Sequence, residues 1–514
     1  MDKITRRKFL ETSAKGVALA SIPFVFQFDP LAAFAAPNGE GMDLNAYFEH
    51  FGVNEGIIKE VMSAALSRGG DYCDLFFQHN ISSYIGLEDK VVNRAYTSVD
   101  FGVGIRVLKG DQTGFSFTEE ISPKAMKLAA KTAANIAADT ATKPPHTFSL
   151  QKPADFYPIS TPWETVKIDR KIPYLESLNE KVYAKDTDIV KTRVSFSDDT
   201  TYMLFINSDG MISYDYQPMS ELSASCTVEK DGQRESGSYD LCGRYSIEYF
   251  SPENLDLIAE EAYQKTMILF QSVKPEAGEM PVILAAGSSG ILLHEAIGHG
   301  MEADFNRKEE SIFADKIDKK VAESFVSIVD DGTNPGMRGS INIDDEGNQS
   351  EKTFLVRDGI LRSYMHDKIS AQHYKVKPTG SGRRQSFRYP PLPRMRNTYM
   401  LPGPHTKDEI IASVKKGLYA DTFTNGQVYI GPGDFSFYVK TGYLIEDGKI
   451  TKPVKDINII GNGPDVLSKI TMVGNDLEFA KGGWTCGKGG QSVPVSMGLP
   501  TVKVSSITVG GVNS

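Results

Sequence analysis

The chain has 514 residues, of which 40% are hydrophobic and 24% are charged. This length and composition are typical of a globular protein with room for two or three domains, so they exclude a predominantly disordered chain. The formal net charge of −10 argues against nonspecific binding to nucleic acid or to an anionic membrane surface.

The N-terminus has the features of a twin-arginine signal peptide. The pair Arg6-Arg7 is followed by Phe9-Leu10, an apolar stretch over residues 16–28 and the small-residue site Ala33-Phe34-Ala35. We therefore expect residues 1–35 to direct export, with a periplasmic mature chain, or an anchored one if the signal is not removed. The apolar stretch is short for a membrane-spanning helix, and no later apolar segment approaches the required length. We therefore expect no membrane-spanning helix in the mature chain.

Four cysteines remain in the mature part: Cys73, Cys226, Cys242 and Cys486. An even number in an exported chain allows two disulfides, but a chain of this size does not need them for stability. The twin-arginine route carries folded proteins, often with metal already inserted. We therefore expect one cysteine in a metal site and the other three as buried thiols.

The first half predicts an α+β domain over residues 45–272. Helical spacing of apolar residues covers 54–68, 122–139, 169–184 and 252–270, and β-like runs cover 73–78, 83–87, 101–108, 114–118, 191–196, 200–206, 211–216 and 220–229. A Lys-Pro-Glu-Ala-Gly segment at 274–278 indicates the boundary between the domains.

The second half predicts a β-rich, mostly antiparallel domain over residues 278–514, with many Gly/Pro turns after Val326. It opens with a buried strand at 280–284 and a turn of small residues at 285–290. A helix carrying His294 and Glu295 follows, for which Ser288 or Ser289 is a suitable N-cap.

The central motif is His294-Glu295-Ala296-Ile297-Gly298-His299. A spacing of five residues places two side chains about 140° apart around a regular α-helix, so a straight helix would not let both histidines bind one metal. Gly298 lacks a Cβ and so permits a bulge or a sharp helix ending that turns His299 back toward His294. The alternative is that the two are unrelated histidines around a turn in the core.

A glycine-rich segment near the C-terminus supplies a third candidate ligand, Cys486. Two histidines and one thiolate leave the fourth position of a tetrahedral zinc ion open, which is the arrangement of a catalytic site. Glu302 is the alternative third ligand. Otherwise, Glu302 and Asp304 are candidates for orienting the imidazole rings.

Three segments resemble the TldD/PmbA metallopeptidases, which are also labelled modulators of DNA gyrase. They are HEAIGHGMEADFNRK at 294–308, PLPRMRNTY at 391–399 and TCGKGGQSVPVSMGLPTVKVSSITVGG at 485–511. The resemblance implies an N-terminal α/β-mixed domain and a C-terminal β-rich antiparallel domain. It also implies one zinc ion per catalytic subunit, bound by His294, His299 and Cys486, and cleavage of unfolded or small peptides.

Well-known members of that family work as a heterodimer with a TldE/PmbA-type sister subunit that lacks the histidine motif. This chain keeps the motif and so resembles the catalytic TldD-type subunit, as a heterodimer or a homodimer. Familiar members are cytoplasmic, so their substrates and the gyrase-linked role do not carry over to a chain with an export signal.

The expected mechanism uses zinc to acidify water and Glu295 as the general base that passes the proton to the leaving amine. Residues 368–407 carry nine Lys/Arg and no Asp or Glu. Within an acidic chain this stretch favours structural pairing with acidic groups, or a role for Arg383 and Arg384 in binding a peptide carboxylate, over contact with nucleic acid.

The oxyanion-stabilising residue is left open, because nothing in the sequence places His366, His373 or His405 near the metal. Peptides suit strand addition in a cleft of a β-rich domain. Two other functions compete with the peptidase: a noncatalytic assembly subunit stabilised by zinc, and an amidase that acts on a cell-wall peptide.

Overall fold

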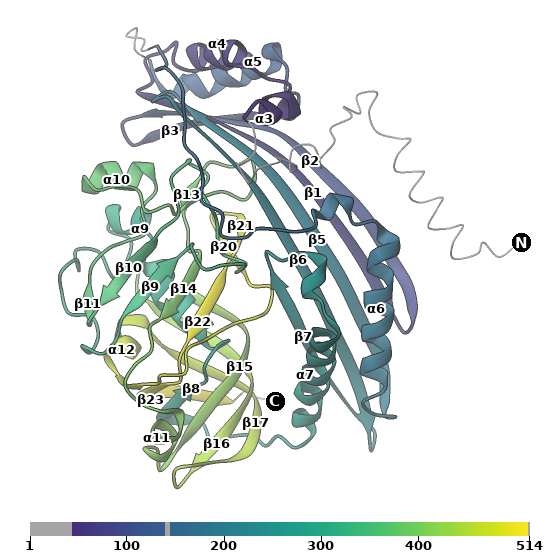
Figure 1. Cartoon of the computed structure of the whole chain (residues 1–514). Coiled ribbons are helices and arrows are strands. Elements are labelled where there is room, and N and C mark those ends of the chain that lie inside the picture. Colours follow the sequence, from purple (N-terminus) through teal and green to yellow (C-terminus); the bar gives the residue numbers. More distant parts are fainter. Residues whose placement is uncertain (1–43, 139–143, 512–514) are drawn as a thin grey trace, which may run out of the picture. The chain divides into compact units, whose positions relative to one another are not determined.

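The computed structural model describes residues 44–138 and 144–511 (Figure 1). The chain divides into two compact units, residues 1–57 and 58–514. The described part of the first unit contains helix α3 (Leu44–Phe51) and the first residues of helix α4 (Glu55–Ala65). The predicted twin-arginine signal, residues 1–35, lies outside the described residues. All remaining elements belong to the second unit.

A seven-stranded sheet forms most of the first half of the second unit. Its strands are β1 (Tyr72–Glu88), β2 (Val91–Lys109), β3 (Gln112–Thr118), β4 (Ser149–Leu150), β5 (Ile189–Asn207), β6 (Met211–Lys230) and β7 (Gln233–Gly243). They run in the order β3-β2-β1-β5-β6-β4, and β7 also pairs with β6. Neighbours are antiparallel except β4, which runs parallel to β6.

The strands of this sheet are longer than the sequence predicts. The sequence predicts separate runs such as 73–78 and 83–87, but β1, β5 and β6 are continuous over 17, 19 and 20 residues. Asn80 of β1 pairs directly with Thr201 of β5. Its side-chain amide donates to Asp199 at 2.7 Å and to Thr201 at 2.8 Å. The prediction of separate short strands was wrong because these polar groups bond to one another across the ladder.

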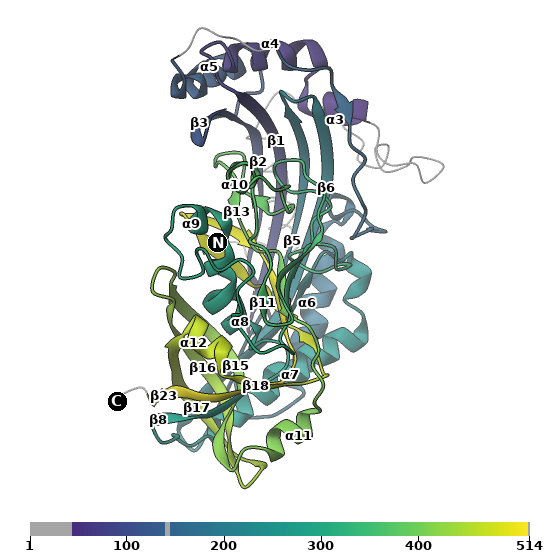
Figure 2. The same ribbon diagram turned by 90° about the vertical axis from the view of Figure 1, so that its left-hand side faces the viewer.

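Helices α6 (Ile168–Tyr183) and α7 (Pro252–Phe270) cover one face of the sheet (Figures 1 and 2). Their buried positions Leu178 and Ile258 belong to one apolar core with Phe196 of β5. Both helices lie where the apolar spacing predicts them. Helix α5 (Pro123–Ala133) packs on β2 and β3, and short 3₁₀ turns cover Ala134–Ile136, Trp163–Thr165 and Ile247–Tyr249.

Five strands of the second half close into a barrel. They are β8 (Gly278–Leu284), β15 (Lys416–Tyr429), β16 (Asp434–Glu446), β17 (Lys449–Asn462) and β23 (Val502–Gly511). The order is β17-β16-β15-β8-β23, and pairing between β17 and β23 closes the ring. Strand β18 (Ile470–Val473) pairs with β23, while helices α11 (Lys407–Ala412) and α12 (Gly463–Ser468) complete this region.

A second sheet of the same half has the order β11-β10-β9-β14-β22-β19. Its strands are β9 (Ile328–Asp331), β10 (Lys352–Arg357), β11 (Ile360–Leu361), β14 (Asn397–Met400), β19 (Glu478–Phe479) and β22 (Ser496–Leu499). Two small antiparallel pairs stand apart from the sheets: β12 (Gly382–Arg383) with β13 (Leu392–Pro393), and β20 (Thr485–Lys488) with β21 (Gln491–Pro494).

A helical segment between β8 and β9 lies in the core of this half. It consists of α8 (Gly290–Leu293), a π-helical turn (His294–Gly298), a 3₁₀ turn (His299–Met301) and α9 (Ala303–Arg307); α10 (Lys368–Tyr374) follows further along the chain. One apolar cluster joins Leu293 and Ala296 of this segment to Val282 and Leu418 of the barrel and to Cys486. The candidate ligands are therefore anchored in a packed core.

The predicted α+β fold class is confirmed, and most strand pairs of the second half are antiparallel, with β8/β15 and β14/β22 as parallel exceptions. The division into domains at 45–272 and 278–514 stays a prediction. Within residues 44–138 and 144–511, the helices are all too short or too polar to cross a membrane.

Candidate metal centre

The two histidines lie on the helical segment that follows β8. Its apolar side chains Ile291, Leu292 and Leu293 are all buried, which explains why the segment is held inside the core. Ser289 occupies the predicted N-cap position but makes no side-chain cap hydrogen bond. Its hydroxyl donates back to the carbonyl of Ala285, and that of Ser288 donates to Asp421 O at 3.0 Å. The position of the N-cap is therefore confirmed, but both hydroxyls bond to carbonyl groups instead of accepting from the helix.

A π-helical turn brings the histidines together. The backbone N–H of His299 donates to the carbonyl of His294, five residues earlier, so the two side chains face the same side of the helix. Their ring centroids are 5.1 Å apart and the rings are nearly perpendicular, at 84°. A Cβ at Gly298 would stand 2.1 Å from the sulfur of Met395, so glycine is required by this close approach. The predicted bulge at Gly298 is confirmed.

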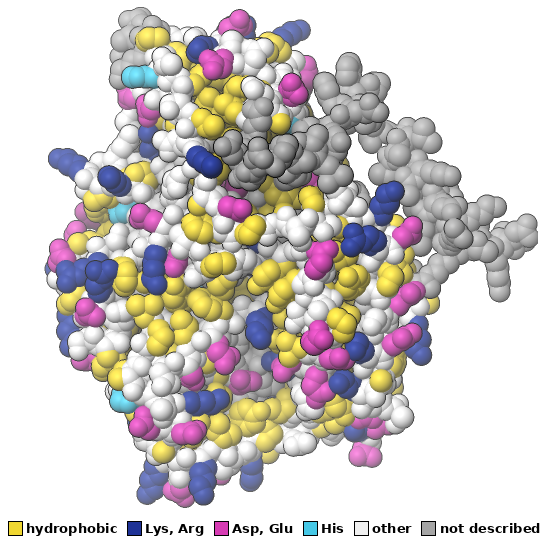
Figure 3. All heavy atoms as spheres, in the orientation of Figure 1, with side chains coloured by type: hydrophobic (Ala, Val, Ile, Leu, Met, Phe, Trp, Pro, Cys, Tyr) yellow, Lys and Arg dark blue, Asp and Glu magenta, His cyan; other side chains and the backbone are white. Residues whose placement is uncertain are grey.

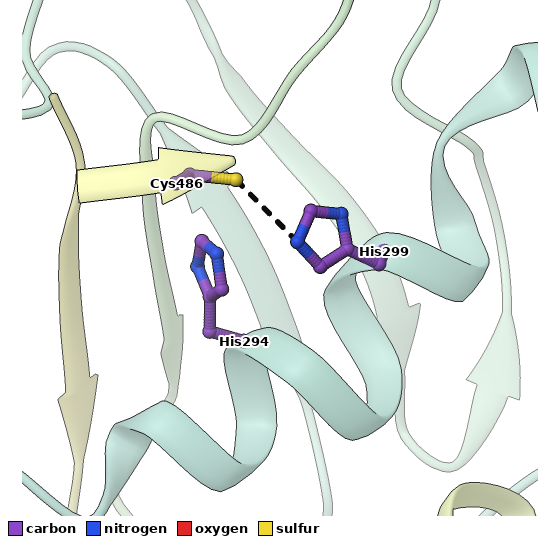
Figure 4. A group of neighbouring side chains, drawn as sticks. All are labelled: His294, His299 and Cys486. Atoms are coloured by element: carbon purple, nitrogen blue, oxygen red, sulfur yellow. Dashed lines mark hydrogen bonds between the residues drawn. The ribbon is translucent and has the colours of Figure 1, made fainter. Parts of the chain in front are cut away.

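Cys486 reaches the histidines from strand β20 (Figure 4). Its sulfur lies 3.4 Å from Nε2 of His299, and potential ligand atoms of all three side chains lie within 4.8 Å of one another. All three residues are buried, with 1%, 4% and 2% of their surface exposed for His294, His299 and Cys486. Residues 187 positions apart thus converge on one point.

The charges of the three groups favour a thiolate beside imidazolium in the absence of a metal. Burial alone would raise the pKa of the Cys486 thiol, but His294 and His299 hold that pKa well below its usual value. Burial likewise opposes the charged form of His299, yet the charges of Glu302 and Cys486 raise its pKa well above the usual range. A thiolate is the form of cysteine that binds metals.

The donor set fits zinc. Nδ1 of His294 is buried and has no hydrogen-bond partner within the described part of the chain, which is costly unless a ligand satisfies it. Two imidazoles and one thiolate suit a borderline-soft divalent ion, and three protein ligands leave one position open. The candidate site is therefore a buried His-His-Cys site.

Glu295 lies beside this cluster without being part of it. One of its carboxylate oxygens is 3.8 Å from Nε2 of His299, and 21% of its side chain is exposed. It is therefore the most solvent-accessible side chain of the motif. This position suits a group that exchanges protons with water next to the ligand atoms.

Glu302 contacts the other nitrogen of His299. Its Oε2 accepts a hydrogen bond from Nδ1 at 2.9 Å, while Nε2 faces Cys486. The carboxylate is fully buried; burial would raise its pKa, but the charges of Lys488 and His299 hold the pKa at about 2. This geometry matches the predicted orienting contact and puts Glu302 on the side of the ring away from Cys486, which disfavours the alternative of Glu302 as third ligand.

Asp304 reaches the histidine only through a lysine that the sequence prediction did not identify. Nζ of Lys488 lies 2.7 Å from Asp304 and 3.1 Å from Glu302. Within the described part of the chain, Asp304 forms no hydrogen bond or ion pair with either imidazole. The available signal for Lys488 was its position two residues after Cys486, because residues i and i+2 of a strand point to the same face.

Arg383 and Arg384, the predicted peptide-binding arginines, are both 4% exposed. Arg383 donates to the carbonyl of Met395 at 2.7 Å, and Arg384 lies 3.6 Å from Asp74 and donates its backbone N–H to Asp345. Both side chains still line a cavity of about 600 Å³. Their role in binding substrate stays a prediction.

Two further arginines of the basic stretch form ion pairs, as the sequence interpretation favours. Arg388 bonds to Asp100 and Glu119, and Arg396 bonds to Asp330 at 2.7 Å. On the face drawn in Figure 3, acidic and basic side chains are interspersed. The stretch is thus a source of buried and surface ion pairs.

The remaining candidate residues lie outside the cluster. His366 is buried beside the rings of Tyr364 and Tyr374, His373 is exposed on α10, and His405 is half-buried in a short bridge to Gly474. Which residue stabilises an oxyanion stays open. Cys73, Cys226 and Cys242 are buried free thiols, as predicted.

Two cavities that share lining residues lie between the seven-stranded sheet and the second half of the chain. Their volumes are about 1080 and 600 Å³, and Tyr84 and Glu221 line both. Trp484 lines the larger cavity and Thr485 the smaller one, whereas Cys486, the next residue of β20, points to the histidines. The smaller cavity therefore adjoins the strand that carries the candidate ligand Cys486.

Models of one protein family match most of the described chain. Models of the PmbA/TldA metallopeptidase family match residues 73–137 as domain 1, 161–270 as the central domain and 277–511 as the C-terminal domain. A protein of Haemophilus influenzae named a metalloprotease TldD homolog is 42% identical over 454 residues, covering 87% of this chain and 94% of that protein.

More distant similarity extends to an archaeal protein and to a solved structure. A zinc metalloprotease TldD homolog of Saccharolobus solfataricus is 27% identical over 454 residues, covering 86% of this chain and 97% of that protein. A Thermotoga maritima protein described as a candidate modulator of a DNA gyrase superposes with a TM-score of 0.72 at 22% identity, covering 89% of this chain and all of that one (100%). At that identity, the superposition shows a shared fold alone.

Proposed function

The chain belongs to the PmbA/TldD family of metalloproteases, and from this premise we propose that it is a zinc-dependent peptidase that cleaves unfolded or small peptides. The observation that carries the proposal is the buried convergence of His294, His299 and Cys486 on one point. Three such ligands with one open position are the pattern of a catalytic zinc site. The similarity to a named zinc metalloprotease supports the choice of metal.

In the proposed mechanism the three side chains hold the zinc ion, and Glu302 fixes the ring of His299 through Nδ1. Zinc at such a site supplies Lewis acidity, which acidifies water and polarises the carbonyl of a peptide. Glu295 accepts a proton from the attacking water at its carboxylate and passes it to the leaving amine. Its exposure and its 3.8 Å distance from Nε2 of His299 support this role in the His-Glu-x-x-x-His motif.

The cleft next to β20 supports an extended polypeptide as substrate. Among the described strands, β20 pairs only with β21, so its other edge is available for strand addition. A peptide paired along β20 would lie about 4.8 Å from the strand that carries Cys486. Small polar side chains such as Ser195 and Ser223 line the larger cavity, so they leave room for peptides of different sequences.

Filling the cleft tests this part of the proposal. Ser223→Trp places a large ring in the larger cavity, whose lining includes none of the three candidate ligands. We expect a lower kcat/KM for peptides with zinc affinity unchanged. Unchanged peptide turnover by this variant would contradict the assignment of the cleft.

The proposal extends to assembly and location. We propose that the chain is exported by the twin-arginine pathway to the periplasm and that it works with a TldE/PmbA-type sister subunit or as a homodimer. Cell fractionation with Arg6→Lys/Arg7→Lys as the comparison tests the export, and light scattering of the purified chain, alone and with a sister subunit, tests the assembly. Cytoplasmic retention of the natural chain would contradict the proposed export. A monomer both alone and with the sister subunit would contradict the proposed assembly.

One experiment addresses the activity. The purified chain is analysed for metal content and then incubated with a peptide library, with and without a zinc chelator. We expect about one zinc ion per chain and chelator-sensitive cleavage of peptide bonds. Glu295→Gln should keep its zinc and lose at least about 100-fold in turnover, because general base catalysis contributes on that scale.

The outcomes separate the competing functions. Stoichiometric zinc without any hydrolysis would favour a noncatalytic assembly subunit, and cleavage confined to cell-wall peptides would favour an amidase. A Glu295→Gln variant with full turnover would refute the role of Glu295. Tight stoichiometric zinc in Cys486→Ala would favour Glu302 as the third ligand.

A further inference from the structure

Lys488 is a buried lysine whose ammonium group contacts three oxygen atoms next to the metal cluster. Its side chain is 6% exposed. Nζ pairs with Glu302 at 3.1 Å and with Asp304 at 2.7 Å, and it donates to the carbonyl of Pro393 at 3.0 Å. The same ammonium lies 4.3 Å from the centre of the Phe305 ring. A lysine this deeply buried is held in one geometry, since each lost partner would leave a charge without compensation.

These contacts close a ring between strand β20 and the helical segment. The sulfur of Cys486 lies 3.4 Å from Nε2 of His299, and Nδ1 of the same ring lies 2.9 Å from Glu302. Glu302 in turn lies 3.1 Å from Lys488, which is two residues from Cys486 on the same face of β20. The strand therefore meets the helical segment twice, once through a candidate ligand and once through an ion pair.

The ion pair acts on the carboxylate that sets the orientation of His299. Oε2 of Glu302 receives both the imidazole N–H and the ammonium, while Oε1 is buried without a partner in the described residues. Lys488 is thus the main cationic contact that keeps this buried carboxylate in place. Without it, Glu302 has one fixed contact left, and the ring of His299 loses the support that turns Nε2 toward Cys486.

Resting on the proposed zinc site, we propose that Lys488 is a positioning residue of the metal centre. By holding Glu302 against Nδ1 of His299, it fixes the imidazole relative to Cys486, and it sets the register between β20 and the helical segment. Its contribution is to the affinity and geometry of metal binding, without contact to the metal or the substrate. Partners that orient metal ligands in this way are worth about 10- to 100-fold in metal affinity.

Metal affinity of the full chain provides the test. Zinc affinity is measured by competition with a chromogenic chelator, and the ligand field is read from the visible spectrum of the cobalt-loaded protein. For Lys488→Met we expect zinc affinity to fall about 10- to 100-fold and the cobalt bands to shift. Lys488→Arg keeps the cation and should recover most of the affinity.

A matched control separates this role from the loss of any buried ion pair. Lys171 is 4% exposed and pairs with Asp198 on the first sheet, away from the cluster. Lys171→Met should destabilise the fold to a similar extent and leave zinc affinity unchanged. Equal losses of zinc affinity in Lys171→Met and Lys488→Met would overturn the proposal, because the effect would then be general.

A double-mutant cycle tests whether Lys488 acts through Glu302. In a Glu302→Gln background, adding Lys488→Met should change zinc affinity less than twofold, since the carboxylate it positions is gone; fully additive losses would contradict the proposal. If Lys488→Met does not fold, Lys488→Gln is used in the same comparison. A natural chain without zinc at His294, His299 and Cys486 refutes the proposed function itself, whereas a zinc-binding chain insensitive to Lys488→Met refutes this inference alone.

Discussion

Gly298 lies in the π-helical turn between the two histidines, and its replacement by alanine tests whether that turn positions the metal site. A Cβ at this position would stand 2.1 Å from the sulfur of Met395, whereas carbon atoms in contact are about 3.5–4.0 Å apart. Met395 is fully buried, at 0% exposure, so its sulfur has no solvent to move into. The helix turn or the methionine must shift.

The size of the effect follows from the crowding. Extra methyl groups in a packed core cost about 1–3 kcal/mol, and the adaptable methionine side chain places Gly298→Ala near the lower end. Because His299 follows Gly298 directly, a displaced turn moves its imidazole relative to Cys486. We expect zinc affinity to fall about tenfold, which corresponds to about 1.4 kcal/mol.

The assay is chelator competition for zinc, combined with urea unfolding of the metal-free protein. Gly487→Ala is the control, since a Cβ at Gly487 meets no atom within 4 Å although the residue adjoins Cys486. Adding Met395→Ala to Gly298→Ala should restore zinc affinity, even though Met395→Ala alone costs about 2–5 kcal/mol of stability. Wild-type zinc affinity in Gly298→Ala, or no recovery in the double variant, would refute the reasoning.

Three further predictions concern stability. Burial raises the pKa of Asp215 to about 6, above the unfolded value of about 3.9, so the folded chain keeps a proton that the unfolded chain releases. The free energy of unfolding should therefore fall by at most about 3 kcal/mol as pH rises from 4 to 6. Urea titrations of Asp215→Asn should lack this pH dependence. Arg106 is buried between Asp74 and Glu346, so Arg106→Met should cost about 3–5 kcal/mol in urea unfolding, and a loss below 1 kcal/mol would contradict this. Chelation of bound zinc should lower the melting temperature, because free zinc at about 1,000 times its Kd stabilises the folded chain by about 4 kcal/mol. An unchanged melting temperature would argue against a zinc site that forms only in the folded chain.

Sequence patterns predicted the elements whose signal is local. Helix α7 begins and ends at the residues that the apolar spacing indicates, with Ser251 capping its first turn through Asn254. The bulge at Gly298 was also predictable, because only a break in α-helical geometry lets histidines five residues apart meet. In both cases, neighbours in sequence determine the conformation.

Features that depend on distant contacts escaped prediction. The polar centres of β1 and β5 resemble turns until Asn80 is seen to bond to Asp199 across the ladder. The hydroxyl of Ser289 bonds to a carbonyl that only the folded loop presents. These are tertiary effects that override local preference.

The candidate site shows the same limit. Its three predicted ligands do converge, but the sequence does not show which other residues contact them. Asp304 contacts Lys488, which the sequence did not single out, and Arg384 contacts Asp74 and Asp345, while the predicted role of Arg384 in binding substrate stays a prediction. Lys488 went unnoticed because its partner Glu302 lies 186 residues away in the chain.

The central claim is that two imidazoles and one thiolate hold a single zinc ion. X-ray absorption at the zinc edge of the purified chain, compared with Cys486→Ser, tests it most directly. We predict one sulfur at about 2.3 Å and two imidazole nitrogens at about 2.0 Å from the metal, with the sulfur lost in the variant. A zinc ion without a sulfur ligand in the natural chain would contradict the account.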